Sequence, residues 1–577
     1  MRASDVGREV VLCGWVRKRR DHGGVIFVDL RDRTGITQVV FKPDTEHAAH
    51  EKAQAVRAEW VLVVRGIVTR RDGDSANPNL PTGEIELVAH EVRLLNSATT
   101  PPFEIEDDVQ IDESSRLKYR IHDLRRPMMQ RRLLVRHKLA QSLRASCSAR
   151  GLTEIETPIL ARATPEGARD FLVPSRMQPG NFYALPQSPQ IMKQMLMVAG
   201  FDGYFQLARC FRDEDQRADR QLEFTQLDLE MSFVGVDDVL DVLEHITANA
   251  YRDVLGVELA RPFPRITYKD AMARYGSDKP ERRIALELVE LSDLLAKSEF
   301  KVFAGALSSG GVVRGLPIPD AAALTRSELD RLNEQARTFG AKGLAWVRVG
   351  EDGTWQSPIA KFLSDQEKAA ITERAGLRPG SVILFGADRE KVVCDVLGRL
   401  RLELGQKLGR YDGRVWDPHF VVGFPLFEEG DDGALTYMHM PFVAPLESEL
   451  AKLDTDPGSV EATHYDLVMN GVELGSGSLR NHRSDVQLRI LEILGYSEAE
   501  ARARFGFMLD ALDAGAPPHG GFAFGFDRLA LMLAGGDSLR DVIAFPKTQR
   551  AQDIFMESPS GIEPAQLKEL GLRLRET

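Results

Sequence analysis

The chain has 577 residues, of which 43% are hydrophobic, and a formal net charge of −12. Because a single hydrophobic core stops growing at roughly 250 to 300 residues, this length predicts several domains. The negative charge excludes general attraction to nucleic acid, so any contact with RNA must come from local basic patches. The four cysteines lie far apart and indicate neither a disulfide framework nor a zinc site, which fits a reducing cytoplasm. No signal-peptide core and no run of about 18 apolar residues occurs, so we expect no association with a membrane.

Short runs with the pattern of β-strands fill the first hundred residues. Strands are predicted at 10–16, 25–30, 36–41, 61–68 and 84–95, and a helix at 46–59. Five strands with a helix between the third and the fourth predict an OB β-barrel. The turn between the first two strands is basic from Arg17 to Arg20, and Phe27 follows on the second strand. Basic groups attract phosphates and an exposed ring stacks on an unpaired base, although a solvated turn with Phe27 in the core is the alternative.

A proline-bearing, acidic segment follows and breaks both periodicities, so we expect a linker at 101–127. From Met128 the apolar spacing predicts a helix that ends at Gly151 in a left-handed cap, before a strand that ends in Thr157-Pro158. The next loop, 164–170, combines a glycine with three charged residues in the position of a mobile lid. A rigid solvated turn is the alternative for this loop.

The most distinctive stretch is Phe211-Arg-Asp-Glu214 with its two flanks. Both flanks alternate apolar and polar residues, which predicts two antiparallel strands joined by a charged loop. Because alternate residues of a strand point the same way, we expect Arg212 and Glu214 to share one face. A guanidinium there can bind a phosphate, and a nearby carboxylate can bind an amine or a metal. Taken alone, the stretch is equally compatible with a surface hairpin that carries ordinary ion pairs.

Residues 281–410 have a mixed pattern that interrupts the chain between two groups of motifs. Strands are predicted at 300–303, 343–349 and 382–385, and helices at 326–339 and 359–374. This pattern predicts an inserted α+β domain. Its residues show no catalytic constellation, so the sequence does not indicate what this domain does.

Two further motifs lie in the last third of the chain. Asp466 and Glu473 are carboxylates that a hairpin brings together, and magnesium prefers carboxylate and phosphate oxygens. At this spacing alone, ordinary surface charges are the alternative. From Gly520 a glycine-rich strand runs into an apolar helix, with Arg528 at the junction. Glycines there let a flat ring or a phosphate approach the backbone closely.

Thr157-Pro158, the Phe211 stretch and the Gly520 stretch follow one another in the order typical of class II aminoacyl-tRNA synthetases. Together with 164–170 and with Gln-Ser-Pro-Gln-Ile-Met-Lys at 187–193, they closely resemble the bacterial-type aspartyl-tRNA synthetases along essentially the whole chain. The resemblance implies a cytoplasmic homodimer and a multidomain α+β fold. The implied domains are an OB-fold anticodon-binding barrel at 1–100, a hinge at 101–127, an antiparallel-sheet catalytic domain at 128–280 and 411–550, a bacterial insertion domain at 281–410 and a C-terminal extension at 551–577.

The resemblance also implies a reaction, in which L-aspartate and ATP form aspartyl-adenylate and pyrophosphate before aspartate passes to the 3′ end of tRNA(Asp). The implied catalytic residues are Arg212, Glu214 and Arg528. Aspartate would be bound by Glu166, Ser188, Gln190, Lys193, Arg212, Asp228, His439 and Arg480. ATP would be bound by Arg212, Asp213, Glu214, Gln221, Phe224, Glu473, Gly525, Phe526, Asp527 and Arg528, and Mg²⁺ by Asp466 and Glu473. Met440 departs from the pattern, since many relatives have a second histidine there.

Lys193 lies one helical turn after Pro189 and can face inward. A carboxylate taken out of water needs fixed cations, because an unpaired buried charge costs several kcal/mol. We expect Lys193 and Arg480 to supply them. Asparagine would leave these charges unpaired, and mismatches of this type discriminate by roughly 10⁴ or more.

Arg20, Phe27 and Gln38 fall where the family contacts the anticodon, and His22 and Gly73 fall at or near positions linked to the choice of tRNA. His22 favours a non-discriminating enzyme that also charges tRNA(Asn), with an amidotransferase acting downstream. The alternatives are an enzyme restricted to tRNA(Asp), in which His22 is simply a turn residue, and a synthetase for asparagine or lysine. A non-catalytic RNA-binding paralogue is disfavoured by the presence of the catalytic arginines and carboxylates.

Overall fold

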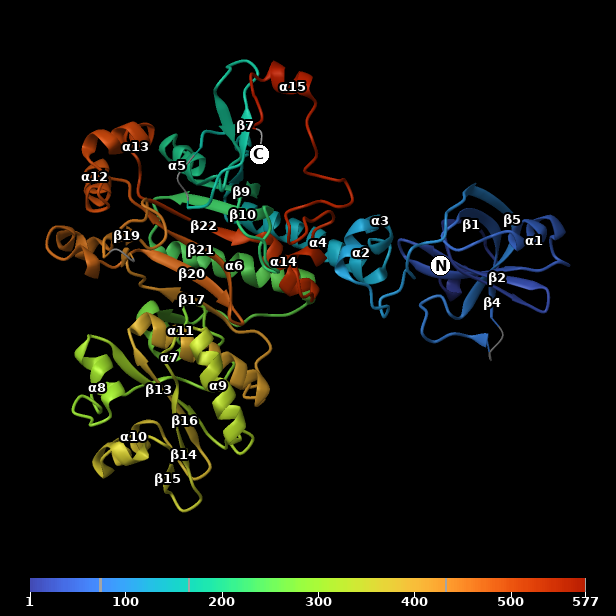
Figure 1. Ribbon diagram of the computed structural model, residues 1–577. Helices are drawn as coiled ribbons and strands as arrows, with labels where there is room; N and C mark the ends of the chain where they lie inside the picture. The colour runs from blue at the N-terminus through green and yellow to red at the C-terminus, as the bar shows by residue number, and fades with distance from the viewer. Residues whose placement is uncertain (72–74, 164–166, 431–432, 576–577) are drawn as a thin grey trace. The chain divides into compact units, whose positions relative to one another are not determined.

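The computed structural model describes residues 1–71, 75–163, 167–430 and 433–575. The chain forms two compact units, one of residues 1–131 with 544–560 and one of residues 132–543 with 561–577 (Figure 1). Each unit has hydrophobic cores of its own. Within the described ranges, no helix has both the length and the apolar character that crossing a membrane requires.

The N-terminal unit begins with a closed five-stranded barrel in the order β1-β2-β3-β5-β4. Its elements are β1 (Glu9–His22), β2 (Val25–Asp32), β3 (Gly35–Phe41), α1 (His47–Gln54), β4 (Val61–Arg70) and β5 (Ile85–Asn96). Alternate residues such as Ile26, Val28 and Leu30 fill the interior, as the period of a strand requires. The predicted OB barrel is confirmed.

The basic run was predicted as a turn, and this prediction is wrong. Pairing of β1 with β2 continues as far as His22 opposite Val25, so residues 17–22 belong to the strand. Only Gly23 and Gly24 form the turn, with φ of 60° and 83°. A two-residue hairpin turn with positive φ at both positions favours glycine, and its twist matches that of the strands, which lets the ladder run to the tip.

The segment 101–127 is a packed connection instead of a featureless linker. It contains α2 (Glu113–Lys118) and α3 (Arg120–Asp123), and α4 (Pro127–Ala149) begins at its end. Arg120 is fully buried, pairs with Asp123 at 2.5 Å and donates to the carbonyl of Ala544 at 2.8 Å. Asp112 caps α2 by accepting from the amide of Ser115. Prolines and acidic residues at the start of the segment hid these short helices from the periodicity.

An eight-stranded sheet forms the centre of the second unit, in the order β11-β17-β20-β21-β22-β10-β9-β6. Its strands are β6 (Thr153–Glu154), β9 (Gly203–Phe211), β10 (Glu223–Ser232), β11 (Arg265–Thr267), β17 (Pro418–Val422), β20 (His464–Met469), β21 (Val472–Arg480) and β22 (His519–Gly525). The central strands are antiparallel, as predicted, and only the edge pairs β6–β9 and β11–β17 are parallel. Strands that are nearly 300 residues apart in the sequence, β10 and β22, thus lie side by side (Figure 1).

The two faces of this sheet differ because its strands alternate. Leu227, Leu229, Phe522 and Phe524 point to one face and are buried in a core with residues of α6 (Val236–Leu255) and α14 (Phe526–Ala534). The residues between them, such as Asp228 and Glu230, point to the other face. Helix α5 (Gln190–Val198) carries buried Lys193, whose ammonium contacts Asp228 on that polar face. The strict period of two therefore builds a polar floor on an apolar core.

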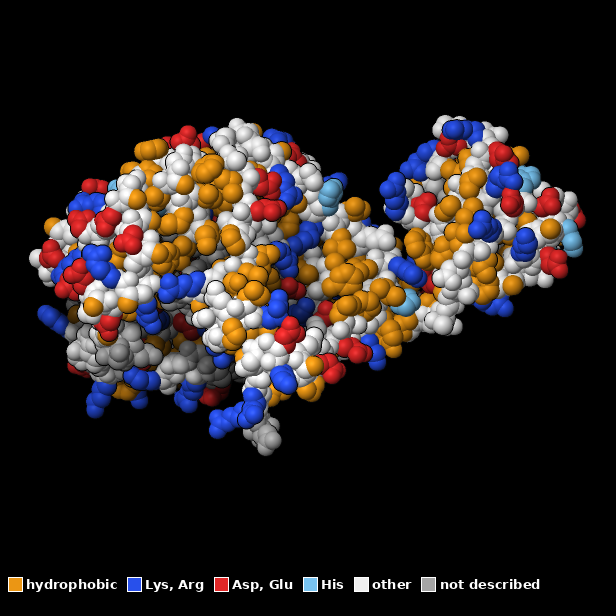
Figure 2. Space-filling model, turned by 90° about the horizontal axis from the view of Figure 1, so that it is seen from above, with side chains coloured by type: hydrophobic (Ala, Val, Ile, Leu, Met, Phe, Trp, Pro, Cys, Tyr) orange, Lys and Arg blue, Asp and Glu red, His pale blue; other side chains and the backbone are white. Residues whose placement is uncertain are grey.

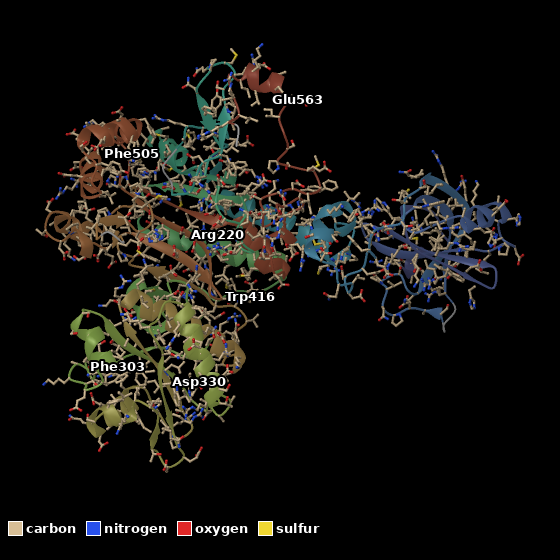
Figure 3. All side chains as sticks on the ribbon, viewed as in Figure 1. Arg220, Phe303, Asp330, Trp416, Phe505 and Glu563 are labelled. Carbon is tan, nitrogen blue, oxygen red and sulfur yellow. The ribbon has the colours of Figure 1, made fainter. Side chains whose placement is uncertain are left out.

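The inserted domain has a five-stranded sheet in the order β12-β13-β16-β14-β15. Its elements are β12 (Val289–Glu290), α8 (Lys301–Ser308), β13 (Val312–Ile318), α9 (Arg326–Thr338), β14 (Ala345–Val349), β15 (Trp355–Gln356), α10 (Asp365–Arg374), β16 (Val382–Asp388) and α11 (Glu390–Lys407), preceded by α7 (Tyr268–Tyr275). The α+β prediction holds, but the strand predicted at 300–303 is wrong. Phe303, labelled in Figure 3, is fully buried. Its ring forms a T-shaped pair with that of Phe300 across the first turn of α8. The helix predicted from 359 begins only at Asp365, because Ser364 and Glu367 form a capping box there.

The remaining elements lie outside the two large sheets. They are β7 (Leu172–Pro174), β8 (Phe182–Ala184), β18 (Phe427–Glu429), β19 (Leu435–Tyr437), α12 (Ser484–Ile493), α13 (Glu498–Asp513) and α15 (Pro564–Glu569). Short 3₁₀ helices occur at Ala3–Asp5, Ala360–Phe362, Glu447–Asp454, Pro457–Ser459 and Leu539–Asp541.

Candidate active site

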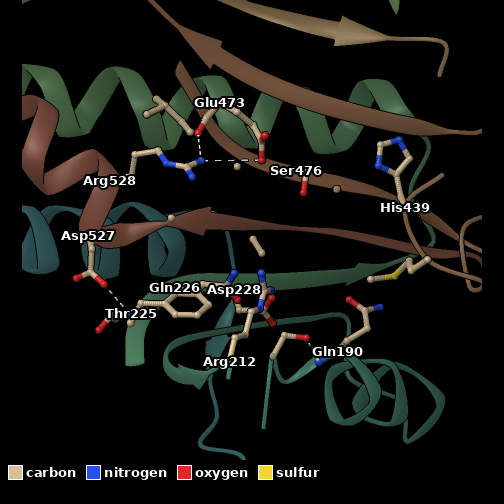
Figure 4. Close-up of a pocket in the computed structure, with 18 of the residues that line it drawn as sticks. Gln190, Arg212, Thr225, Gln226, Asp228, His439, Glu473, Ser476, Asp527 and Arg528 are labelled. Atoms are coloured by element: carbon tan, nitrogen blue, oxygen red, sulfur yellow. Dashed lines mark hydrogen bonds and ion pairs between the residues drawn. The ribbon is translucent and has the colours of Figure 1, made fainter. Parts of the chain in front are cut away.

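A cavity of about 680 Å³ opens on the polar face of the eight-stranded sheet (Figure 4). Asp228 of β10 lies opposite Ala523 of β22, which lies opposite Ser476 of β21 and then Asp466 of β20. Residues that face each other across neighbouring strands point to the same side of a sheet. The cavity is within the range of about 300–1,000 Å³ that small-molecule sites occupy.

Gly521 leaves room for a buried carboxylate in this floor. A Cβ at Gly521 would lie 2.0 Å from Oε2 of Glu230 and 2.2 Å from the carbonyl oxygen of Leu229. The glycine-rich strand was expected to admit a flat ring or a phosphate. At Gly521, however, the group that approaches the backbone is the side chain of Glu230.

Four buried charges form an ion cluster at one end of the cavity. The Lys193 ammonium lies 2.7 Å from Asp228 and 3.2 Å from Glu230, and the Arg480 guanidinium contacts both oxygens of Glu230 at 2.9 and 3.3 Å. Each side chain is at most 4% exposed. Lys193 and Arg480 therefore come together as predicted, but Glu230 already pairs with both. Glu230 was not among the predicted site residues, although its alternation with Asp228 along β10 places both carboxylates on the polar face.

Burial raises the pKa of Asp228 to about 6, against the opposing effect of Lys193. Burial is also the largest single effect on Glu230, but the charges of Arg480 and Lys193 together outweigh it and lower the pKa of Glu230. Oδ2 of Asp228 and Nε2 of Gln190 have no hydrogen-bond partner among the described residues. Buried polar atoms are normally paired, so a polar ligand is expected to contact these two atoms. Ser188 also lines the cavity here.

Arg212 and Glu214 line the cavity, although not on one strand as predicted. Strand β9 ends at Phe211, and both residues lie in the following loop. The guanidinium of Arg212 lies 5.1 Å from the centre of the Phe224 ring, and its Nε has no partner within the described part of the chain. Glu214 pairs with Arg220 at 3.2 Å. Gln221 also lines the cavity, whereas Asp213 is not among its lining residues and lies 3.9 Å from Arg169.

Arg528 and Glu473 occupy the end of the cavity away from His439 and Gln190 (Figure 4). The guanidinium of Arg528 donates to the carbonyl of Glu473 and lies 4.0 Å from its carboxylate. Asp527 faces the cavity with Gly525 but accepts from the amide of Thr225 at 2.7 Å and pairs with Arg136. Its carboxylate therefore fastens α14 to β10.

Phe526 does not line the cavity. Its ring lies in the core, with the guanidinium of Arg136 4.6 Å from its centre. A direct contact of this ring with ATP, as implied by the resemblance, has no support in the structure.

Two carboxylates of the β20–β21 hairpin lie in an environment that suits a divalent cation. Burial, with a contribution from Asp278, raises the pKa of Asp466 well above its usual range. Burial and then the charge of Asp466 raise the pKa of Glu473. Carboxylates whose ionisation is hindered by burial and by neighbouring acids are stabilised by a cation beside them. The described residues contain no cluster of three such ligands, so substrate phosphates and water would have to complete a coordination shell.

His439 lies at the end of the cavity away from Arg528 (Figure 4), with its ring stacked on that of His464. The ring centroids are 3.4 Å apart with an interplanar angle of 6°. Burial lowers the pKa of His439 to about 2 and that of His464 to about 3, so both rings are neutral. The sulfur of Met440 lies 3.9 Å from the guanidinium of Arg480. His464 and Lys279 also line the cavity, and neither was predicted from the sequence. Lys279 lies in the loop after α7, where no sequence motif marks it.

The predicted anticodon residues lie together on the outside of the barrel. Arg20 faces Phe27 across the β1–β2 pair and donates to Asp29 at 2.7 Å and to Gln38 at 3.3 Å. Gln38 in turn donates to Glu86 at 2.9 Å. Phe27 is half-buried and is not part of the barrel core, contrary to the alternative that placed it there.

The residues predicted to bear on the choice of tRNA and on closure of the site are only partly placed. His22 is exposed at the tip of β1. Gly73 and Glu166 lie outside the described residues.

Comparisons with known proteins agree with this geometry. The model of the "tRNA synthetases class II (D, K and N)" matches residues 112–549, and that of the "OB-fold nucleic acid binding domain" matches residues 10–95. Proteins from Syntrophotalea carbinolica and Moorella thermoacetica, both named Aspartate--tRNA(Asp/Asn) ligase, are 52% and 54% identical. The matches cover 99% of this chain and 96% and 95% of those proteins.

Solved structures show the same fold at low sequence identity. Asparaginyl-tRNA synthetase from Pyrococcus horikoshii, complexed with asparaginyl-adenylate, has a TM-score of 0.59 at 21% identity, with 95% of this chain and 96% of that chain covered. With a family model over most of its length and relatives that are more than half identical, the chain belongs to the class II tRNA synthetases of the D, K and N family.

Proposed function

We propose that this protein is an aspartate–tRNA ligase that charges both tRNA(Asp) and tRNA(Asn). The observation that carries the proposal is the identity of 52–54%, over nearly the whole chain, to proteins named Aspartate--tRNA(Asp/Asn) ligase. The cavity supports aspartate as the substrate, because Lys193 and Arg480 both line it and can donate to a carboxylate ligand in addition to their partners Asp228 and Glu230. We assign anticodon binding to 1–100, a hinge to 101–127, catalysis to 128–280 and 411–550, an insertion to 281–410 and a C-terminal extension to 551–577.

The substrate would lie between the two ends of the cavity. Its side-chain carboxylate would contact Lys193 and Arg480. Its ammonium would contact Asp228, whose Oδ2 has no partner among the described residues, together with Ser188 and Gln190, which also line the cavity. His439 would close this end. Glu166, in the loop 164–170, would act as a lid over this end of the cavity.

ATP would occupy the other end. Its adenine would stack on Phe224, with Gln221 and Glu473 as further contacts, and its γ-phosphate would meet Arg528. Arg212, next to Phe224, would hold the α-phosphate and the reacting carboxylate, with Glu214 beside it. Asp466 and Glu473 would hold Mg²⁺, which supplies charge to neutralise the phosphates.

The reaction then needs no side-chain nucleophile. A carboxylate oxygen of aspartate bonds to the α-phosphorus as the bond to pyrophosphate breaks, and the terminal ribose hydroxyl of tRNA later takes the aspartyl group from AMP. The residues of the chain orient the reactants and neutralise growing charge, which accounts for the arginines around the cavity.

The barrel would bind the anticodon through Arg20, Phe27 and Gln38, whose side chains share its outer face. His22 and Gly73 would permit tRNA(Asn), and an amidotransferase would then have to convert the aspartyl-tRNA(Asn) produced. We also propose a homodimer in the cytoplasm. Exposed hydrophobic side chains on the second unit support the dimer, since Leu134 is 57%, Leu172 59% and Phe182 44% exposed. Figure 2 shows groups of hydrophobic side chains among the charged residues of the surface.

Two assays test the proposal. Amino-acid-dependent exchange of pyrophosphate into ATP should occur with L-aspartate and be at least 10³-fold weaker with L-asparagine or L-lysine, on the order expected for a polar mismatch. Aspartylation of tRNA(Asp) and tRNA(Asn) transcripts, side by side at one salt concentration, should then proceed at comparable rates. Charging of tRNA(Asp) alone would contradict the relaxed choice of tRNA and leave the ligase assignment intact. Exchange that prefers asparagine would overturn the assignment.

A further inference from the structure

His464 makes two different contacts from one buried position at the start of β20. Its ring stacks face to face with His439, at 3.4 Å between centroids. Its edge reaches Asp466, with Nε2 of His464 2.9 Å from Oδ1 of the carboxylate. The two contacts join the amino-acid end of the cavity to the carboxylate of the proposed cation site.

The stack is clamped by a rigid neighbour. Phe424 is fully buried and meets His439 at 5.0 Å and His464 at 4.9 Å, edge to face in both cases. Aromatic pairs of this geometry contribute about 0.5–1.5 kcal/mol beyond the area they bury. Neither imidazole can therefore turn without disturbing the other two rings.

The hydrogen bond to Asp466 suits a carboxylate that binds a cation. Such a carboxylate is ionised and only accepts, so Nε2 of His464 would donate to it. The other ring nitrogen, Nδ1, is buried and has no partner among the described residues. An apolar ring would fill the same space without burying an unpaired acceptor, which costs about 1–3 kcal/mol. Packing alone therefore does not explain a histidine at this position.

The register places His464 on the wall of the cavity. It lies opposite Ser478, which lies opposite Gly521, which in turn lies opposite Glu230. This is the row of the sheet that carries the ion cluster. His464 lines the cavity together with His439.

We propose that His464 is a positioning residue that orients Asp466 toward the bound cation through its edge and holds His439 against the amino acid through its face. The inference rests on the proposed function, because it assumes that Asp466 contacts a cation and His439 the substrate. Groups that orient a metal ligand typically change metal affinity by about 10–100-fold when they are removed. A lost ring stack of 0.5–1.5 kcal/mol corresponds to about a 2–10-fold change in affinity.

Two substitutions separate the contacts. His464→Phe keeps a flat ring for the stack and removes the hydrogen-bond donor. His464→Gln keeps a side-chain N–H that can reach Asp466 and removes the aromatic ring. We would measure the Mg²⁺ concentration for half-maximal pyrophosphate exchange and the KM for L-aspartate. Mn²⁺ binding, followed by electron paramagnetic resonance in the presence of a non-hydrolysable ATP analogue, reports on the cation site without catalysis.

The expected pattern is a crossed one. His464→Phe should weaken Mn²⁺ binding and raise the Mg²⁺ midpoint at least 10-fold, with a change below about 3-fold in the KM for aspartate. His464→Gln should raise that KM about 2–10-fold and leave the Mn²⁺ affinity within about 3-fold. His419→Phe is the matched control, because His419 is fully buried on β17 and does not line the cavity. It should change thermal stability only.

The proposal is overturned if His464→Phe binds Mn²⁺ as tightly as the wild type, or if both variants change the two quantities equally, as a general packing defect would. Should the phenylalanine variant not fold, the glutamine variant decides alone, since equal loss of Mn²⁺ and aspartate binding contradicts the proposal. A wild-type protein without aspartate-dependent exchange would instead refute the proposed function, and Mn²⁺ binding would still test the link between His464 and Asp466.

Discussion

Replacing Glu230 with glutamine tests the ion cluster directly. The carboxylate of Glu230 is fully buried, contacts Arg480 at 2.9 and 3.3 Å and lies 3.2 Å from Lys193. Glutamine keeps the size and one acceptor oxygen but removes the charge, so two buried cations would share only Asp228. We therefore expect Glu230→Gln to destabilise the second unit.

The size of the effect follows from the burial of all four side chains. Removing one partner of a buried ion pair costs about 3–5 kcal/mol, because the other charge is left without compensation. In a unit of this size, the loss corresponds to a fall in the thermal midpoint of about 5 °C. L-Aspartate should restore part of the lost thermal midpoint, since its side-chain carboxylate replaces the missing charge. At 100 times its Kd, a ligand raises the free energy of unfolding by about 2.7 kcal/mol.

Differential scanning calorimetry of the wild type and of Glu230→Gln, with and without L-aspartate, measures these thermal midpoints. L-Asparagine serves as the uncharged comparison and should restore nothing. Glu492→Gln is the matched control, because Glu492 is 66% exposed in its pair with Arg489 and such surface pairs contribute about 0–1 kcal/mol. The reasoning is refuted if Glu230→Gln unfolds within 1 °C of the wild type, or if asparagine restores its midpoint as well as aspartate does.

Four further outcomes are expected. The kcat/KM for aspartate should fall as the pH drops through about 6, because the ammonium needs ionised Asp228, and this limb should vanish in Asp228→Asn. Since the folded state holds the Asp228 proton more strongly than the unfolded state, the contribution of Asp228 to stability should decrease as the pH rises from about 4 to 6, which denaturant titrations measure. Arg528→Ala should raise the KM for ATP about 10–100-fold, because a charge-assisted hydrogen bond contributes about 1.5–3 kcal/mol to binding. An unchanged KM for ATP would show that Arg528 does not contact ATP. Arg20→Ala should raise the KM for both tRNAs and leave pyrophosphate exchange unchanged, and any loss of exchange would contradict an anticodon role.

Local patterns predicted the parts of the fold that depend on neighbouring residues. The period of two in β9 and β10 and the helix α4 appeared where they were expected, although Leu134, predicted on the apolar face of α4, is exposed. The strand predicted at 300–303 failed because four largely apolar residues carry no period, and only packing of Phe303 in the core of the inserted domain decides for a helix. The basic run of β1 failed because charge was taken as a sign of a turn, whereas the twist of the Gly23-Gly24 turn lets the ladder continue to its tip.

The sequence by itself determined the family, the barrel and the residue types that we propose for binding ATP and aspartate, because these depend on motifs and on alternation along single strands. Only the tertiary structure decided which charges meet. Glu230 and Arg480 are 250 residues apart, and their contact depends on the register of β10, β22 and β21. The stack of His439 on His464 likewise joins a loop to a strand. A one-residue shift in the register of β10 with β22, or of β22 with β21, would turn these side chains to the apolar face. The site is therefore built by pairing between distant strands and not by local preferences.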